Sequence, residues 1–114
     1  MKFDHSELEN GIGLLKLAGK LDIIGVGEIE IRFAGYCSGD HVRVIVDLSD
    51  VDFLASIGIR LLVTTAKSVA SRGGKMVLLN PIPEVFEVLE VTGIPSIIPT
   101  YSRLESAETV LLAS

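Results

Sequence analysis

Hydrophobic residues in this chain follow two different periods, and the order of those periods predicts its elements. Short apolar runs at 11–19, 42–48 and 76–79 have the length and composition of strands buried in a sheet. At about 26–36 and at 59–70, apolar residues instead recur every three or four positions, which is the spacing of an amphipathic helix. The pattern therefore predicts strands that alternate with helices.

Glycines mark the ends of the elements in the first half of the chain. The polar segment 2–9 is only weakly strand-like, and we expect an edge strand that pairs antiparallel with the first apolar run across a turn at 9–11. Gly25 and Gly27 weaken the start of the first helix, since a glycine costs about 1 kcal/mol inside a helix. The segment 37–40 then ends that helix.

Glycine and proline also delimit the elements of the second half. Gly73 stands where the second helix should end, Pro83 can open a third helix, and Gly93 can end it. A short edge strand is predicted at 96–99. The segment 102–105 has the pattern of a capping box, which predicts a final helix. The apolar face of that helix is formed by Leu104, Ala107 and Leu111.

This order of elements, ββαβαβαβα, predicts an α/β fold with a mixed, mostly parallel sheet and about four helices. A strand, a helix and a strand at this spacing indicate a right-handed parallel crossover. No repeat or linker interrupts the pattern, so we expect one domain over residues 1–114.

Composition narrows the classes of function. With 48% hydrophobic residues the chain can build a core, and its net charge of −5 without a basic run argues against a nucleic-acid surface. No apolar stretch is long enough for membrane insertion, and the start of the chain is too polar for a signal peptide. A single cysteine, Cys37, excludes an internal disulfide and a cysteine-based zinc site. We expect a cytoplasmic protein without a cofactor.

The segment from Asp47 to Ile59 carries the most specific signal. A buried strand is predicted to run into a short acidic loop with Asp50 and Asp52, and the loop delivers Ser56 to the start of a long helix. One interpretation makes Ser56 a helix N-cap, whose oxygen accepts a hydrogen bond from a backbone amide. A second makes it a phosphorylation site, because the amides and dipole of a helix N-terminus stabilise a phosphate.

That segment resembles the signature of the STAS domain, and specifically that of bacterial anti-sigma factor antagonists. The resemblance extends over nearly the whole chain and includes 19–22, 73–78 and 92–94. It implies that Ser56 is phosphorylated by an ATP-dependent serine kinase that is itself the anti-sigma factor. The unphosphorylated protein would bind that kinase and free the sigma factor, and a metal-dependent phosphatase of the PP2C type would reset the switch.

The resemblance also implies a partner-binding surface made of Asp22, Ala55, Ser56, Ile57 and Gly58. In the family, the aspartate matching Asp22 lies near the serine and contacts the partner, and the glycine matching Gly58 lets the partner approach. From the residues alone, Asp22 at a strand-to-helix junction is a cap or turn residue.

Two positions depart from the family pattern. Ala55 stands where the family commonly has an acidic residue, and Ile57 where it often has a small polar one. The loss of the carboxylate favours an alternative function, in which the chain is a constitutive STAS scaffold or the binding subunit of a transporter or sensory complex.

An enzymatic function has little support in the sequence. His5 or His41 would have to join Ser56 and an aspartate in a triad, but neither lies in a recognisable motif. His41 also comes before a strand whose far end leads to Ser56, so it should lie at the opposite end of the sheet. We therefore predict a binding protein that is not an enzyme.

Overall fold

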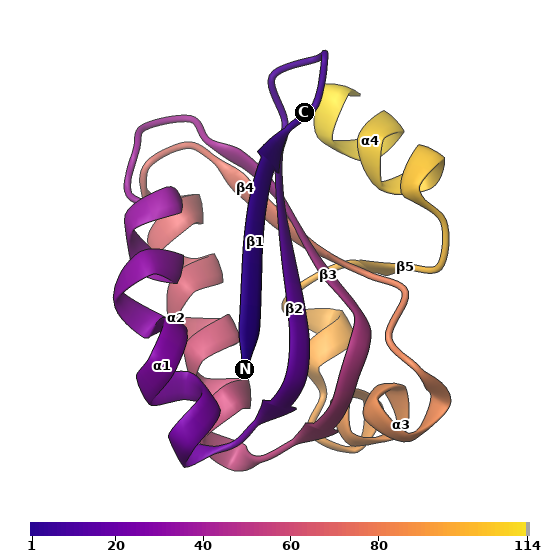
Figure 1. The fold of residues 1–114 in the computed structure, drawn as a ribbon. Helices are drawn as coiled ribbons and strands as arrows, with labels where there is room; N and C mark the ends of the chain where they lie inside the picture. The colour runs from indigo at the N-terminus through magenta and orange to yellow at the C-terminus, as the bar shows by residue number, and fades with distance from the viewer. Residues whose placement is uncertain (114) are drawn as a thin grey trace.

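The computed structural model describes residues 1–113, and its elements follow the predicted order. The strands are β1 (Lys2–Glu7), β2 (Gly13–Leu21), β3 (Arg43–Leu54), β4 (Lys75–Leu79) and β5 (Thr100–Tyr101). The helices are α1 (Ile23–Tyr36), α2 (Ser56–Ser71), α3 (Pro83–Val91) and α4 (Leu104–Ala113), with a 3₁₀ turn at Ile94–Ser96. Figure 1 shows these elements along the chain.

The five strands form one sheet in the order β1-β2-β3-β4-β5. β1 pairs with β2 antiparallel, and the other neighbours pair parallel, so the sheet is mixed and mostly parallel as predicted. Because β2, β3 and β4 run in one direction, the helices that follow β2 and β3 both begin at the same end of the sheet (Figure 1).

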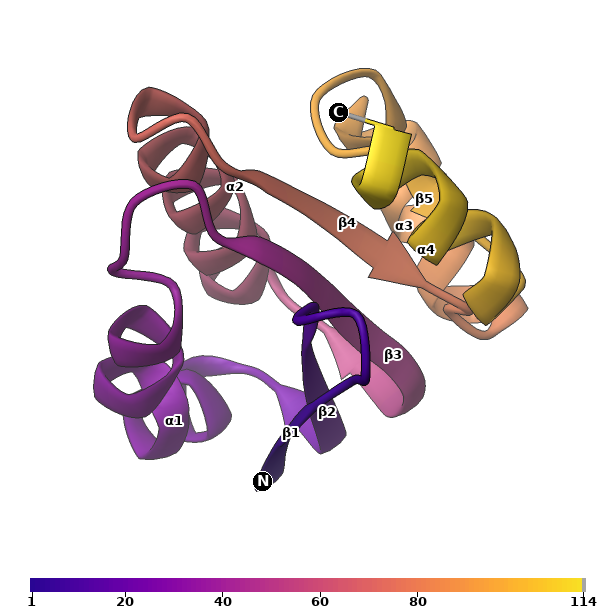
Figure 2. The same cartoon turned by 90° about the horizontal axis from the view of Figure 1, so that it is seen from above.

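Helices cover both faces of the sheet. α1 and α2 lie side by side on one face, and α4 covers part of the other (Figure 2). Side chains from α1, α2 and α3 join one large hydrophobic core, in which Phe33, Leu62 and Leu89 are fully buried. A smaller core lies under α4, where Ala107 and Leu111 pack against the sheet as the predicted face of the last helix required.

Two elements of the first half are longer than predicted. β3 continues through Asp47, Asp50 and Asp52 to Leu54, so the expected acidic loop is wrong. Pairing with β2 holds this segment extended, with register irregularities that accommodate its extra residues. α1 begins at Ile23 because Asp22 caps it there.

The last segment differs from the prediction in two places. The edge strand is Thr100–Tyr101 and not 96–99, because Ile94–Ser96 forms a 3₁₀ turn and Leu78 donates a backbone hydrogen bond to Pro99. The capping box is not formed: α4 begins at Leu104, so Arg103 occupies the position before the helix. The Ser102 hydroxyl makes no hydrogen bond to any residue that the structure describes.

Candidate functional site

The candidate site lies where β2 and β3 end together. Leu21 and Leu54 are paired in register, and the Ala55 amide nitrogen lies 3.1 Å from the Leu21 carbonyl oxygen. α1 starts after β2 and α2 starts after β3, so this pairing brings Asp22 next to the residue that precedes Ser56. The juxtaposition expected for Asp22 and Ser56 is therefore built into the sheet.

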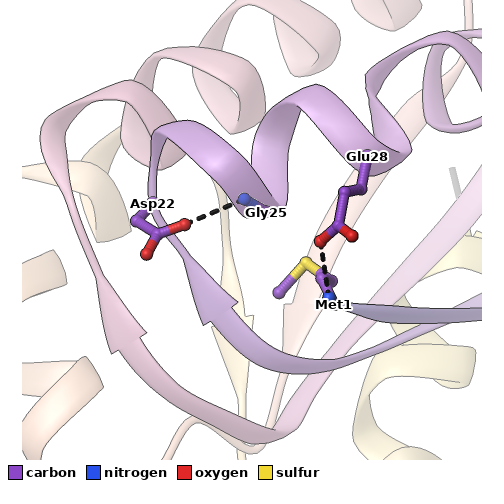
Figure 3. A network of polar contacts seen from close by, with 4 residues as sticks. All are labelled: Met1, Asp22, Gly25 and Glu28. Carbon is purple, nitrogen blue, oxygen red and sulfur yellow. Dashed lines mark hydrogen bonds and ion pairs between the residues drawn. The ribbon is translucent and has the colours of Figure 1, made fainter.

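Asp22 is the N-cap residue of α1. Its side-chain oxygen accepts a hydrogen bond from the Gly25 amide at 2.8 Å (Figure 3). The cap interpretation of Asp22 is confirmed. Gly25 is required beside it, because a Cβ at that position would lie 2.0 Å from the Lys20 carbonyl oxygen. The second carboxylate oxygen of Asp22 is not used by the cap, and the side chain is half-buried.

Ser56 is exposed and is the first residue of α2. The N-cap interpretation of Ser56 is wrong by one position, because Ala55 holds the extended N-cap conformation and its carbonyl accepts from the Gly58 and Ile59 amides. Within residues 1–113 the Ser56 hydroxyl has no hydrogen-bond partner. It is therefore a free hydroxyl presented to solvent at a helix start.

The N-terminus of α2 lacks any neutralising group of its own. Ala55 supplies no side-chain cap, and the first turn contains no acidic residue. By contrast, the first turns of α3 and α4 carry Glu84 and Glu105. Since the first amides of a helix have no partners inside the helix and bear partial positive charge, the start of α2 favours an added anion.

The aspartates of β3 belong to the strand and not to a loop that leads into Ser56. Asp47 on β3 is paired with Lys16 on β2. Its side-chain oxygen accepts hydrogen bonds from the amide and the hydroxyl of Ser49. Asp50 forms an ion pair with Lys16 at 3.4 Å. With about 3.3 Å of rise per strand residue, both lie well away from the start of α2. Of the acidic residues expected near Ser56, Asp22 is brought close to it by the paired ends of β2 and β3.

Gly58 is buried and faces the inside of the molecule. A Cβ there would lie 2.4 Å from Leu21 Cδ2 and 2.6 Å from the Leu21 carbonyl oxygen. β2 thus occupies the space beside Gly58. The missing side chain faces the sheet, where it lets α2 pack closely, and not an approaching partner as expected. Ile57 is half-buried and packs against the large core.

Exposed apolar side chains that no sequence pattern predicted flank the site. Ile23 and Ile24 follow Asp22 and are 72% and 70% exposed, and Phe53 on β3 is 49% exposed. The Lys20 ammonium lies 5.8 Å from the centre of the Phe53 ring. Two isoleucines after a capping aspartate are the available signal, but helical spacing predicts a start of the first helix only at Val26.

The geometry of residues 1–113 does not support a catalytic triad, a metal site or a membrane-spanning helix. His5 and His41 line a cavity of about 350 Å³ beside Arg43, at the opposite end of β3 from Ser56, so the triad is not assembled. Among residues 1–113, no cluster of histidine, cysteine or acidic side chains is arranged to hold a metal ion. No described helix has the length and apolar character needed to cross a membrane.

The sequence of the whole domain decides the family. A family model described as the STAS domain matches residues 6–107. The chain belongs to the STAS domain family. Its α/β fold, one mixed five-stranded sheet with four helices among the described residues, matches that of solved STAS domain proteins.

Relatives of this STAS protein include anti-sigma factor antagonists. BtrV of Bordetella bronchiseptica, assigned as one, is 30% identical over 107 residues, which cover 94% of this chain and 91% of BtrV. An anti-sigma-factor antagonist (STAS) domain protein of Planctomyces limnophilus has a similar structure, with a TM-score of 0.84, 27% identity and 98% of both chains covered.

Bacillus SpoIIAA has the same fold in both of its phosphorylation states. The unphosphorylated form gives a TM-score of 0.77 at 22% identity, with 96% of each chain covered. The phosphorylated form gives 0.71 at 21% identity, with 96% of this chain and 99% of that chain covered. The fold therefore accommodates both states of an anti-sigma factor antagonist.

Proposed function

We propose that this STAS protein is a partner-switching regulator that acts in the cytoplasm. With Ser56 unphosphorylated it binds an anti-sigma factor serine kinase, and phosphorylation of Ser56 by that kinase releases it. A PP2C-type phosphatase removes the phosphate. Asp22, Ala55, Ser56 and Ile57 form the contact surface, and Gly58 holds the start of α2 against the sheet.

The observation that carries this proposal is the free Ser56 hydroxyl. It is exposed, has no hydrogen-bond partner among the described residues, and begins a helix whose first turn contains no acidic residue. A kinase can reach such a hydroxyl without unfolding the domain. The relationship to BtrV, assigned as an anti-sigma factor antagonist, supports the same function.

A phosphate on Ser56 has opposite consequences inside and outside the domain. Within α2, its charge of about −1.5 to −2 sits on the amides of the first turn, which favour it. At an interface, the same charge lies beside Asp22 and Ile57 and must be desolvated by the partner. Misplaced charge at an interface costs several kcal/mol, and each 1.4 kcal/mol is a tenfold loss of affinity.

Phosphotransfer and binding test the proposal together. The protein is incubated with ATP and its purified anti-sigma kinase, and mass spectrometry should place one phosphate on Ser56. Ser56→Ala should bind the kinase and remain unmodified, whereas Ser56→Asp should bind at least about tenfold more weakly. Ser106→Asp is the matched control, because Ser106 is an exposed serine in the first turn of α4.

Ala55 favours one competing function. Without a carboxylate before Ser56, the chain could serve as a constitutive STAS binding module of a larger complex. That function predicts no phosphate on Ser56 and equal binding by Ser56→Ala, Ser56→Asp and the unmodified protein. This pattern of results would refute the switch.

A further inference from the structure

The outward face of α1 is apolar where a surface helix normally carries charge. Val26, Ile29 and Phe33 point into the core, and the residues on the opposite side are exposed. The exposed residues follow helical spacing along the whole helix and form what we call the α1 strip: Ile24, Gly27, Ile31, Ala34 and Gly35. Ile24 is 70% exposed and Ile31 is 85% exposed.

The neighbouring helix shows that this is a property of α1 and not of the fold. α2 packs beside α1 on the same face of the sheet (Figure 2). Its outward positions are polar and exposed, as expected for a solvated helix: Arg60, Thr64, Lys67 and Ser71. The sheet therefore does not require α1 to expose isoleucine.

The glycines of α1 separate into two kinds. Gly25 is fixed by the fold, since a Cβ there would collide with the Lys20 carbonyl oxygen. A Cβ at Gly27 or Gly35 would meet nothing within 4 Å. Each of these two exposed glycines weakens the helix and relieves no contact inside the molecule. Both lower the surface of the strip, so that a partner can approach the helix backbone on either side of Ile31.

The borders of the α1 strip are acidic. Glu28 lies on one side, 2.7 Å from the amino group of Met1 (Figure 3), and Glu30 lies on the other with no ion pair within residues 1–113. The only basic side chain of the helix, Arg32, turns back to donate to the Phe3 carbonyl at 2.9 Å and covers the Phe3 ring. An occupant with basic side chains around an apolar patch complements this surface.

We propose that the α1 strip is the second half of the surface that binds the anti-sigma kinase, which covers it with an apolar patch bordered by basic side chains. This inference rests on the proposed function. The strip starts at Ile24, two positions after Asp22, so it is continuous with the site at Ser56. Ile23, the first residue of α1, adds a further exposed apolar side chain between Asp22 and the strip.

A second copy of this chain fits the strip less well. In a two-fold pairing of α1 helices, the centre of the strip would lie between Glu28 and Glu30 of both copies. Both acidic borders of each copy would then face those of the other copy, and like charges across an interface oppose association. The net charge of −5 adds to this repulsion.

Isothermal titration with the purified anti-sigma kinase tests the inference. Ile31→Glu places a carboxylate in the middle of the strip and should weaken binding at least about tenfold, as loss of an interface anchor does. Val91→Glu is the matched control, because Val91 is an 81% exposed apolar residue on α3. Its binding should stay within about twofold of the unmodified protein. Unchanged melting temperatures would show that both variants fold.

A second variant examines the same surface without adding charge. Gly27→Gln fills the space between Ile24 and Ile31 and should also weaken kinase binding, while the melting temperature stays the same or rises.

The outcomes separate this inference from the proposed function. If Ser56→Asp weakens binding but Ile31→Glu and Gly27→Gln do not, the strip is no part of the interface and the switch stands. If the unmodified protein does not bind the kinase at all, the proposed function fails first. Sedimentation velocity supplies a third result: dimers of the unmodified protein that Ile31→Glu abolishes would assign the strip to self-association and overturn the inference.

Discussion

At the scale of single residues, the site depends on three residues that each have a distinct role. The Asp22 carboxylate caps α1, the absent side chain of Gly58 lets α2 approach β2, and the Ser56 hydroxyl is left without a partner among the described residues. Residues that hold the site together are thus distinct from the residue that is available for modification. Substitutions can test the two groups separately.

Asp22 offers the first such test. Asp22→Ala removes the hydrogen bond to the Gly25 amide and should lower the free energy of unfolding by about 1 kcal/mol. Asp22→Asn removes the negative charge but keeps a capping oxygen, so it should lower the free energy of unfolding by only about a few tenths of a kcal/mol. Urea denaturation of both variants measures the cap. Equal losses of stability in the two variants would contradict the capping role.

Two helical glycines form a matched pair. Gly58→Ala places a methyl group 2.4 Å from Leu21 Cδ2 and should lower the free energy of unfolding by about 1–3 kcal/mol. Gly27→Ala meets no atom within 4 Å and should raise it by up to about 1 kcal/mol. Thermal unfolding of the two variants checks both signs. A stabilised Gly58→Ala protein would show that α2 does not pack on β2 as described.

At the scale of elements, the site depends on α2, whose N-terminus has neither a capping side chain nor an acidic residue in its first turn. It is 16 residues long, and its N-cap residue is an alanine with no side-chain hydrogen bond. Most of its stability therefore comes from packing of its buried face, and its N-terminus remains open to a negative group. Phosphorylation of Ser56 would supply that group.

A capping side chain at position 55 should replace what α2 lacks. Ala55→Asp places an acceptor at the N-cap and a negative charge at the helix start, and should raise the free energy of unfolding by about 1 kcal/mol. Ala55→Gln, which is polar but does not cap, is the control. The gain should disappear below the pKa of the new carboxylate, which guanidinium titrations at pH 7 and pH 3 would reveal. A gain with Gln alone would exclude capping as the cause.

At the scale of the whole molecule, the two faces of the sheet are used differently. The face under α1, α2 and α3 holds the large core, and the face under α4 holds a smaller one. Cys37 lies at the end of α1 inside the large core, where burial raises the pKa of its thiol to about 11 despite the nearby Arg72. The neutral thiol is thus part of the packing.

This raised pKa predicts a loss of stability in base. The unfolded thiol ionises near 9.0 and the folded one near 11, so its contribution is complete below pH 9 and is lost as the pH rises toward 11. The free energy of unfolding should fall by less than about 1.4 kcal/mol per pH unit in this window. Cys37→Ala, compared by urea denaturation from pH 8 to pH 11, should show a shallower fall. Equal slopes would contradict a buried, neutral thiol.

The pattern of the sequence was sufficient for some of these features. The order of strands and helices, the glycines that end α2 and α3, and the position of Ser56 at a helix start follow from local periodicity and from turn and cap chemistry. The capping role of Asp22 follows from its place before an apolar helix. The resemblance of the segment around Ser56 pointed to the STAS family, which the family model then confirmed.

Other features depend on partners distant in the chain. β3 runs through its aspartates because β2 pairs with it there, and no local signal reports that pairing. Gly58 faces Leu21, and Ala55 takes the N-cap position, because the ends of two strands meet. The sequence alone thus determined which elements form and which hydroxyl begins α2. Tertiary structure decided which side chains face outward, because burial is settled by contacts between elements and not within them.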